Sequence, residues 1–144
     1  AYKLEWLAAL RAQAETDLAA GVPLAILGDF NVAPTDDDVW DISLFTDSTH
    51  VTPAERAALT ALESTGLVEV VPRALKYDKP YTFWDYRQLA FPKNTGMRID
   101  LVYASPDVAG KVTDAYVDRD ARKPGKKGAP LPSDHAPVVV DLDV

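Results

Sequence analysis

Apolar residues recur with helical spacing at the start of the chain and with strand spacing at its end. Between residues 4 and 18, leucine and alanine return every three or four positions, and Gly21 and Pro23 then interrupt the pattern. We therefore expect an amphipathic helix over residues 3–20. Apolar side chains also occupy every second position from Val138 to Val144, a spacing that predicts a final strand.

A second helix and several strands are predicted between these ends. Thr52-Pro53-Ala54-Glu55 combines a capping box with proline at the first helical position, so a helix should run from residue 53 to about 65. The apolar run from Leu24 to Leu27 is typical of a buried central strand. Further strand candidates cover residues 67–71, 81–84, 99–104 and 111–117. Proline, glycine and five basic residues predict a mobile loop over 119–133.

The composition is that of a folded domain with a hydrophobic core. The chain has 144 residues, 47% of them hydrophobic, and no run of eighteen apolar residues that could span a membrane. The first residues already belong to the predicted helix, so we expect no secretory signal. The chain has no cysteine, which excludes disulfides and thiol chemistry, and a cytoplasmic location is the simplest interpretation.

Charge is divided unevenly along the chain. The net charge is −7, which argues against a general nucleic-acid binder. Residues 1–72 carry 3 basic and 12 acidic side chains, whereas residues 73–144 carry 12 basic and 10 acidic ones. Any contact with a polyanion should therefore use the second half, although ordinary surface charge is an equally good explanation for most of these residues. The basic residues in question are Arg73, Lys76, Lys79, Arg87, Lys93, Arg98 and the group at 119–127.

Two short polar clusters follow or precede strand candidates. Asp29 and Asn31 come directly after the run at 24–27, and two residues apart in extended backbone they would point the same way. The acid could then take a proton from water while the amide holds a phosphate oxygen. The alternative is an ordinary turn, because Gly-Asp and Asn are common turn residues.

The second cluster is Ser133-Asp134-His135, at the start of the final strand. A histidine beside an acid can be held protonated and can donate to a phosphate oxygen. The alternative is that Ser133 and Asp134 cap a turn. The other histidine, His50, has only Asp47 as a nearby acid, and we interpret it as structural.

Asp100 lies inside an apolar strand candidate. Burying a carboxylate is costly unless something pairs with it, so His135 or Arg98 is the expected partner. An outward-facing acid on an edge strand is the alternative. The aromatic run from Tyr81 to Tyr86 next to Arg87 could stack on a sugar or base, but such a run is more often part of a core.

Taken in order, these segments resemble the exonuclease III class of apurinic/apyrimidinic endonucleases, within the endonuclease/exonuclease/phosphatase superfamily. The likeness covers essentially the whole chain, and its most specific parts are the stretch from Thr82 to Arg87 and the stretch from Lys93 to Leu101. The matching stretches are Gly28 to Asp36, Thr49 to Arg56, Thr82-Phe83-Trp84-Asp85-Tyr86-Arg87, Lys93 to Leu101 with Arg98-Ile99-Asp100-Leu101, and Ser133-Asp134-His135-Ala136-Pro137.

The resemblance implies an α/β fold that is half of a four-layer αββα sandwich, with one mixed, mostly antiparallel β-sheet flanked by helices. Members of this class are longer and consist of two similar halves. Residues 1–144 correspond to the C-terminal half. The N-terminal half of the class supplies an asparagine and a glutamate for the metal and a tyrosine at the phosphate, so we expect this half alone to be inactive or weakly active.

The resemblance also implies a role for each site residue. Asp29 would activate the attacking water, with Asn31 beside it at the phosphate. His135 would bind the scissile phosphate, oriented by Asp100, and Asp134 would be an additional metal-site carboxylate. The residues expected to bind substrate are Phe83, Trp84, Arg87, Met97 and Ile99; three of them, Phe83, Met97 and Ile99, would form an apolar pocket for a flipped-out abasic sugar that excludes an intact nucleotide.

The function implied is that of a DNA-repair nuclease. It would hydrolyse double-stranded DNA at abasic sites or 3′ ends with Mg²⁺ or Mn²⁺, which prefer hard oxygen ligands. The alternatives are a phosphoesterase acting on a small or lipid phosphate and an inactive fragment that binds DNA or a partner. Because sandwich sheets bury each other's apolar faces, we also expect association with the N-terminal half or with a second copy.

Overall fold

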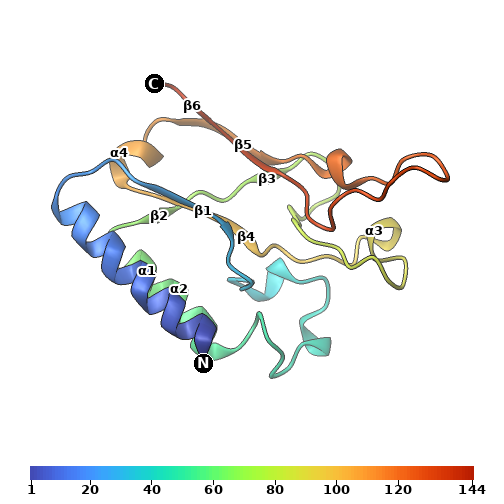
Figure 1. Ribbon diagram of the computed structural model, residues 1–144, viewed down its shortest axis with the longest axis horizontal. Coiled ribbons are helices and arrows are strands. Elements are labelled where there is room, and N and C mark those ends of the chain that lie inside the picture. The colour runs from blue at the N-terminus through green and yellow to red at the C-terminus, as the bar shows by residue number, and fades with distance from the viewer.

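Two helices cover one face of a small antiparallel sheet (Figure 1). The computed structural model describes residues 1–144. Helices α1 (Tyr2–Ala19) and α2 (Pro53–Glu63) pack against each other over the sheet. Its strand order is β1-β4-β2, with β1 at Ala25–Asp29, β4 at Asp100–Ala104 and β2 at Val68–Glu69. Both predicted helices are thus confirmed to within a few residues at their ends.

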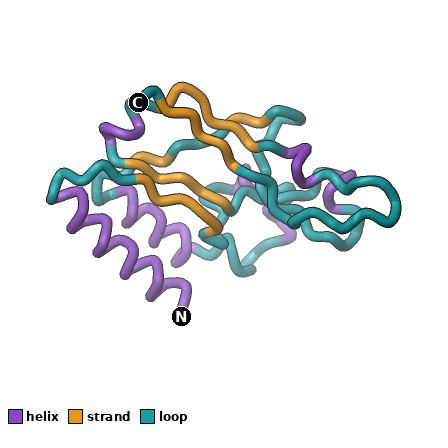
Figure 2. Tube along the Cα trace, turned by 45° about the horizontal axis from the view of Figure 1, so that its top comes forward, coloured by secondary structure: helices purple, strands orange, loops and turns teal.

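A second sheet lies beside the first, and Figure 2 shows the two groups of strands in one view. It contains β3 (Arg73–Ala74), β5 (Val112–Val117) and β6 (Val138–Leu142), with β3 parallel and β6 antiparallel to β5. The predicted α/β class, with mixed, mostly antiparallel strands flanked by helices, is confirmed, and the strands form two three-stranded sheets where one was expected. The chain crosses from one to the other at Pro72, which has no N–H for a ladder.

The start of α2 shows how local sequence sets an element. The Thr52 hydroxyl accepts a hydrogen bond from the Glu55 backbone N–H at 3.2 Å, and Pro53 occupies the first turn. This is half of the predicted capping box, because the Glu55 carboxylate accepts the His50 backbone N–H at 2.9 Å and forms no bond to the Thr52 N–H. The helix ends at Glu63, and Gly66 follows in a left-handed conformation with φ of 112°.

The main core lies between the helices and the first sheet. Leu7 and Ala14 of α1 and Leu59 and Leu62 of α2 are buried against Leu101, Tyr103 and their neighbours. β4 is the buried strand of this sheet, whereas β1 is an edge strand with Leu27 65% exposed. The prediction of a buried central strand at 24–27 was therefore wrong, because β1 pairs on one side only and its outer face is uncovered.

Two further predictions, of a strand at 81–84 and of a mobile loop at 119–133, also change. Residues 81–84 form isolated bridges in place of a strand, through Phe83 to Met97 and to His135. The segment 119–133 begins with a 3₁₀ turn at Arg119–Arg122 whose two guanidinium groups are buried against the Phe91 ring. Each donates to a backbone carbonyl, of Phe91 and of Trp84 respectively, so this end of the segment is anchored to the fold. The remaining short helices are α3 (Ala90–Lys93), α4 (Pro106–Ala109) and 3₁₀ turns at Asp36–Asp38 and Ile42–Leu44.

The uncovered faces of the two sheets meet in an apolar hollow of about 390 Å³. Its eleven lining residues are all hydrophobic and come from β1, β4, β5, β6 and their flanks. We refer to this surface, which includes Leu27, Val102, Val139 and Val140, as the apolar hollow. None of the helices has the length and apolar character needed to cross a lipid bilayer.

Candidate active site

The candidate site forms where two antiparallel strands place an acid opposite an acid. β1 ends at Asp29 and β4 begins at Asp100, and the register of the pair sets these two residues directly across from each other. His135 reaches the same point from the segment that leads into β6, where it bridges Phe83. Three segments that are far apart in sequence thus meet at one end of the first sheet.

The side chains of these three residues are in contact. His135 Nδ1 lies 2.7 Å from Asp100 Oδ2, and His135 Nε2 lies 3.7 Å from Asp29 Oδ2. One potential ligand atom from each residue lies within 4.8 Å of the others. Because the carboxylate can only accept, Nδ1 carries the proton of the short contact, and Nε2 is left to face Asp29. The expected meeting of Asp29, Asp100 and His135 is therefore confirmed.

Asp100 has the partner that its partial burial requires. Burial raises the pKa of the Asp100 carboxyl, and hydrogen bonds from Thr82 and His135 oppose that rise. Of the two partners expected from sequence, His135 is the one that contacts Asp100. Arg98 is directed elsewhere, to Asp38 and Glu69.

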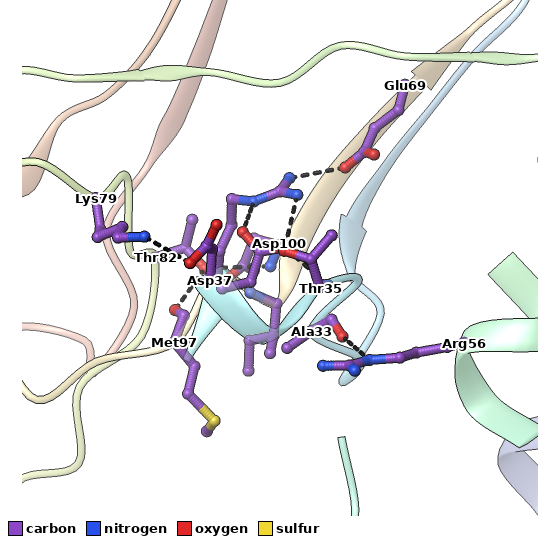
Figure 3. Close-up of polar contacts among 12 residues, drawn as sticks. Ala33, Thr35, Asp37, Arg56, Glu69, Lys79, Thr82, Met97 and Asp100 are labelled. Atoms are coloured by element: carbon purple, nitrogen blue, oxygen red, sulfur yellow. Dashed lines mark hydrogen bonds and ion pairs between the residues drawn. The ribbon is translucent and has the colours of Figure 1, made fainter. Parts of the chain in front are cut away.

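Thr82 connects the segment that carries Asp100 with the segment that carries His135. Its buried hydroxyl accepts the backbone N–H groups of Ile99 and Asp100, each at 3.1 Å (Figure 3). Its carbonyl accepts the N–H of Ala136, the residue after His135, at 2.8 Å. One threonine therefore fixes the backbone next to both Asp100 and His135.

Arg98 forms a buried ion network beside the site. Its Nε and Nη2 donate to both Asp38 oxygens at 2.7 and 3.1 Å, and Nη1 donates to Glu69 at 2.7 Å. Figure 3 shows Glu69 meeting this guanidinium from the neighbouring strand. Asp38 Oδ2 also accepts hydrogen bonds from the Thr35 backbone N–H and hydroxyl. The network therefore connects the loop after β1 with β2 and with the residues that lead into β4.

Asn31 does not sit in extended backbone. It has a positive φ of 53°, and its N–H donates to Asp29 Oδ1 at 2.8 Å. The expectation that Asp29 and Asn31 point the same way along a strand was therefore wrong, since the strand ends at Asp29 and a turn follows. Asn31 nevertheless lines the same 290 Å³ hollow as Asp29. Lys3 Nζ and His50 Nδ1 each lie 2.7 Å from the Asn31 carbonyl oxygen and support this turn.

Asp134 lies on the open side of the histidine. Its Oδ1 is 3.9 Å from His135 Nε2, and the side chain is 38% exposed. The Ser133 hydroxyl accepts the His135 backbone N–H at 3.1 Å, so the turn cap expected as the alternative is present, and the His135 ring still lies against Asp29 and Asp100. Asp29 and Asp134 thus both present carboxylate oxygens toward Nε2.

A cavity of about 510 Å³ opens next to this cluster. Phe83 and Met97 line it, as the sequence suggested, and the Phe83 ring lies 5.2 Å from the His135 ring. Arg87 also lines it, with its guanidinium paired to Asp85 at 3.1 Å. The expected substrate residues are thus in part assembled around one opening.

Two of the expected substrate residues are not on the cavity surface. Trp84 is 1% exposed and packs in a core cluster with Phe91, and its indole N–H donates to Asn94 at 3.0 Å. Ile99 is 2% exposed and belongs to the same buried cluster as Met97. The prediction that these two side chains contact a ligand directly was therefore wrong, because both are enclosed by protein.

A comparison with known protein families covers all three residues of the cluster, Asp29, Asp100 and His135. A model described as the endonuclease/exonuclease/phosphatase family matches residues 1–135. The chain belongs to this family. Among curated proteins, it is 32% identical to exodeoxyribonuclease III of Haemophilus influenzae over 127 residues, covering 81% of this chain and 44% of that protein. It is 33% identical to an exodeoxyribonuclease of Streptococcus pneumoniae over 126 residues, covering 85% of this chain and 42% of that protein.

Solved structures agree with the family assignment. The 3′-5′ exonuclease NExo from Neisseria meningitidis superposes with a TM-score of 0.87 at 34% identity, covering 99% of this chain and 54% of that chain. An AP endonuclease from Archaeoglobus fulgidus gives a TM-score of 0.85 at 31% identity, with the same coverage. This family member therefore spans about half the length of the relatives it matches.

Sequence reasoning did not identify four residues that shape the family member's site. Trp40 and Phe45 line the cavity, Thr82 supports the Asp100 backbone, and Lys3 holds the turn at Asn31. Only Thr82 has a signal in the sequence, because it is a polar residue within an aromatic run. It is buried in the structure, and a buried hydroxyl needs a hydrogen-bond partner. The other three act across the fold, and nothing in their local sequence indicates where they lie.

Proposed function

We propose that this chain carries the C-terminal catalytic half of a DNA-repair nuclease that hydrolyses phosphodiester bonds. The observation that supports it most is the short contact of His135 with Asp100, which leaves His135 Nε2 directed toward Asp29. This hydrolysis needs a base that accepts a proton from water and a cationic group that binds the phosphate, and both must be held in a fixed orientation.

Each residue has a defined task in the proposed reaction. The Asp29 carboxylate accepts a proton from the attacking water, and Asn31 binds beside it at the phosphate. Protonated His135 donates from Nε2 to a phosphate oxygen as negative charge builds there. Asp100 accepts the Nδ1 hydrogen and keeps the ring in this orientation.

The residues on the open side fit a hard divalent cation. Asp29 and Asp134 both present carboxylate oxygens toward His135 Nε2, and both are more than one-third exposed. Mg²⁺ keeps several waters and commonly binds through one or two carboxylates together with substrate phosphate. We assign Asp134 as an additional ligand in this half, and Mg²⁺ or Mn²⁺ bound there would offset charge on the phosphate.

The proposed substrate is double-stranded DNA with abasic sites or 3′ ends. Relatives at more than 30% identity are named as exodeoxyribonucleases, and a solved relative is described as an AP endonuclease. The cavity beside His135 would receive the displaced nucleotide, with Phe83 and Met97 against its sugar. Arg87 at the cavity rim would contact the duplex.

We also propose that activity requires a second half-domain. The apolar hollow exposes hydrophobic side chains of a kind that sandwich folds bury between sheets. A partner half supplied in trans, or a second copy of the chain, would cover it. The isolated chain is therefore expected to be inactive or weakly active.

A substrate comparison tests the proposal. The chain, alone and mixed with the N-terminal half of an exodeoxyribonuclease relative, is incubated with an abasic duplex and with inositol phosphates, in Mg²⁺ or with chelator. We expect Mg²⁺-dependent nicking of the abasic duplex by the mixture and no phosphate release from inositol phosphates. Phosphate release without DNA cleavage would favour a small-molecule phosphoesterase, and binding without cleavage would favour a non-catalytic module.

A further inference from the structure

The two oxygens of the Asp29 carboxylate have different partners. Oδ1 accepts the Asn31 backbone N–H at 2.8 Å, whereas Oδ2 lies 3.7 Å from His135 Nε2. A carboxylate that is bound through one oxygen has a preferred rotamer, so the Asn31 N–H selects the orientation in which Oδ2 faces the histidine. The orientation of Asp29 therefore depends on the turn at Asn31.

The turn at Asn31 needs support from outside itself. With a φ of 53°, Asn31 is in the left-handed region, which costs energy for any residue that has a Cβ. Its carbonyl oxygen is contacted by two side chains, Lys3 Nζ and His50 Nδ1, each at 2.7 Å. Because a carbonyl oxygen can only accept, both nitrogens donate to it. The turn is thus held at its N–H and at its carbonyl.

Lys3 uses all of its donors on protein atoms. Its Nζ lies 2.7 Å from the Asn31 carbonyl oxygen, 3.1 Å from Thr49 Oγ1 and 3.1 Å from Glu55 Oε2. An ammonium group has three N–H donors, so none is left for a ligand. Lys3 lines the same hollow as Asp29, where a free lysine would suit a phosphate, but its contacts are those of a residue that fixes backbone.

Glu55 holds the two donors in place. It is 7% exposed, and its Oε2 accepts both Lys3 Nζ at 3.1 Å and the His50 backbone N–H at 2.9 Å. A buried carboxylate needs such partners. His50 has a φ of 82°, which is costly for histidine, and its carbonyl accepts the Ala33 N–H at 2.8 Å. The backbone on both sides of the His50 ring is therefore fixed, and the ring is directed to Asn31.

These contacts form one connected path to Asp29. Glu55, in the first turn of α2, binds Lys3 in the first turn of α1 and the backbone of His50. Lys3 and His50 both bind the Asn31 carbonyl, and the Asn31 N–H binds Asp29. His50 was expected from the sequence to be structural, but its ring ends two hydrogen bonds away from the candidate base.

We infer that Lys3 and His50 are positioning residues that set the orientation of the Asp29 carboxylate through the turn at Asn31. The catalytic consequence rests on the proposed function, in which Asp29 accepts a proton from the attacking water. Both residues act through Asn31 and leave the reacting atoms to Asp29 and His135. Loss of either donor should therefore slow the reaction without weakening the binding of DNA.

The first test needs no cleavage and follows the Asn31 backbone N–H of the full chain by NMR. A hydrogen bond to a carboxylate moves an amide proton downfield and slows its exchange with solvent. Lys3→Met should move the Asn31 signal upfield and speed its exchange about tenfold or more, and Lys3→Arg, which keeps donors, should restore most of both. Arg11→Met is the control, because Arg11 lies on the same helix in an exposed pair with Glu15. An Asn31 signal that Lys3→Met leaves unmoved would overturn the inference.

The second test measures kcat and KM on an abasic duplex with Mg²⁺ and an N-terminal half. Lys3→Met and His50→Gly, which tolerates the positive φ but has no donor, should lower kcat about 10–100-fold and leave KM unchanged. Lys3→Arg and His50→Asn, which keeps a donor near the place of Nδ1, should recover most of kcat. A raised KM with unchanged kcat would assign these residues to DNA binding and overturn the inference. If the Asn31 signal responds but the unchanged chain cleaves no DNA, the nuclease function fails and the positioning role remains; if DNA is cleaved but neither the signal nor kcat responds, the reverse holds.

Discussion

The imidazole of His135 lies 2.7 Å from the carboxylate of Asp100, although 35 positions separate them in sequence. The contact is possible because Thr82 holds the backbone beside both residues, through the Asp100 N–H and the Ala136 N–H. The orientation of the histidine therefore depends on a residue that lies outside the polar clusters.

This arrangement predicts a pH dependence. Burial raises the pKa of Asp100, so this carboxyl binds a proton more readily in the folded chain than in the unfolded chain, and its contribution to stability is present at low pH and lost as pH rises through the folded-state pKa. Activity has the opposite sign, because only the ionised carboxylate orients the protonated histidine. We expect the acid limb of the nicking rate to lie above the ordinary aspartate pKa.

Thr82 variants test the origin of that limb. Its hydroxyl opposes the rise in the Asp100 pKa, so Thr82→Val should move the acid limb to higher pH, whereas Thr82→Ser, which keeps the hydroxyl, should not. The measurement is the pH profile of cleavage by each variant mixed with an N-terminal half. Identical profiles for Thr82→Val and the unchanged chain would show that Thr82 does not influence Asp100.

The Arg98–Asp38 pair should dominate local stability. Arg98 is 3% exposed, and removing one partner of a buried pair leaves an uncompensated charge, so Arg98→Met should lower the free energy of unfolding by about 3–5 kcal/mol. Arg11→Met is a matched control, because the Arg11–Glu15 pair is exposed and should contribute about 0.5 kcal/mol or less. Urea unfolding measures both. Similar losses for the two variants would contradict the importance assigned to the buried network.

How far the sequence predicts the structure differs between helices and strands. The helices at Tyr2–Ala19 and Pro53–Glu63 follow from local period and capping, which act within a few residues. The partner of β1 lies on β4, some 75 positions along the chain, so its edge position was not visible locally. Segment 81–84 has strand-like residues, but its neighbours are loops, and only isolated bridges form.

The candidate site was predictable where chemistry demanded a partner. A carboxylate in an apolar run requires a cation or donor, and this reasoning pointed to His135 for Asp100. The same reasoning could not choose between Asp38, Glu69 and Asp100 for Arg98, since that depends on how three segments pack. Trp40 and Phe45 had no such requirement, which is why their place in the cavity was not foreseen.

The apolar hollow predicts self-association of the isolated chain. Leu27 lines the hollow and is 65% exposed, so Leu27→Gln should reduce both dye binding and the fraction of oligomer in sedimentation experiments. Leu131→Gln is the control, because Leu131 is 68% exposed but lies outside the hollow. A monomeric chain with low dye binding before any substitution would show that the hollow needs no cover.

The loop at 123–132, which we call the lysine loop, should contribute to DNA binding. Its three lysines, Lys123, Lys126 and Lys127, are exposed, and no acidic residue occurs between positions 121 and 133. Replacing each by glutamine should weaken binding for all sequences and reduce the salt slope by about 0.9 per lost phosphate contact. Lys111→Gln is the control, because it follows α4, at the opposite end of the molecule from the loop (Figure 1). An unchanged slope would place the DNA elsewhere.

The central claim is that Asp100 and His135 act as one unit in phosphodiester hydrolysis, and a double-mutant cycle of the nicking rate tests it most directly. Asp100→Asn, His135→Gln and the double variant are assayed on an abasic duplex with Mg²⁺ and an N-terminal half, with Asp141→Asn as an exposed-acid control. Each single variant should lower the nicking rate about 100-fold or more. The double variant should be no slower than the slower of the two single variants. Losses that multiply, or single variants as active as the control, would contradict the account.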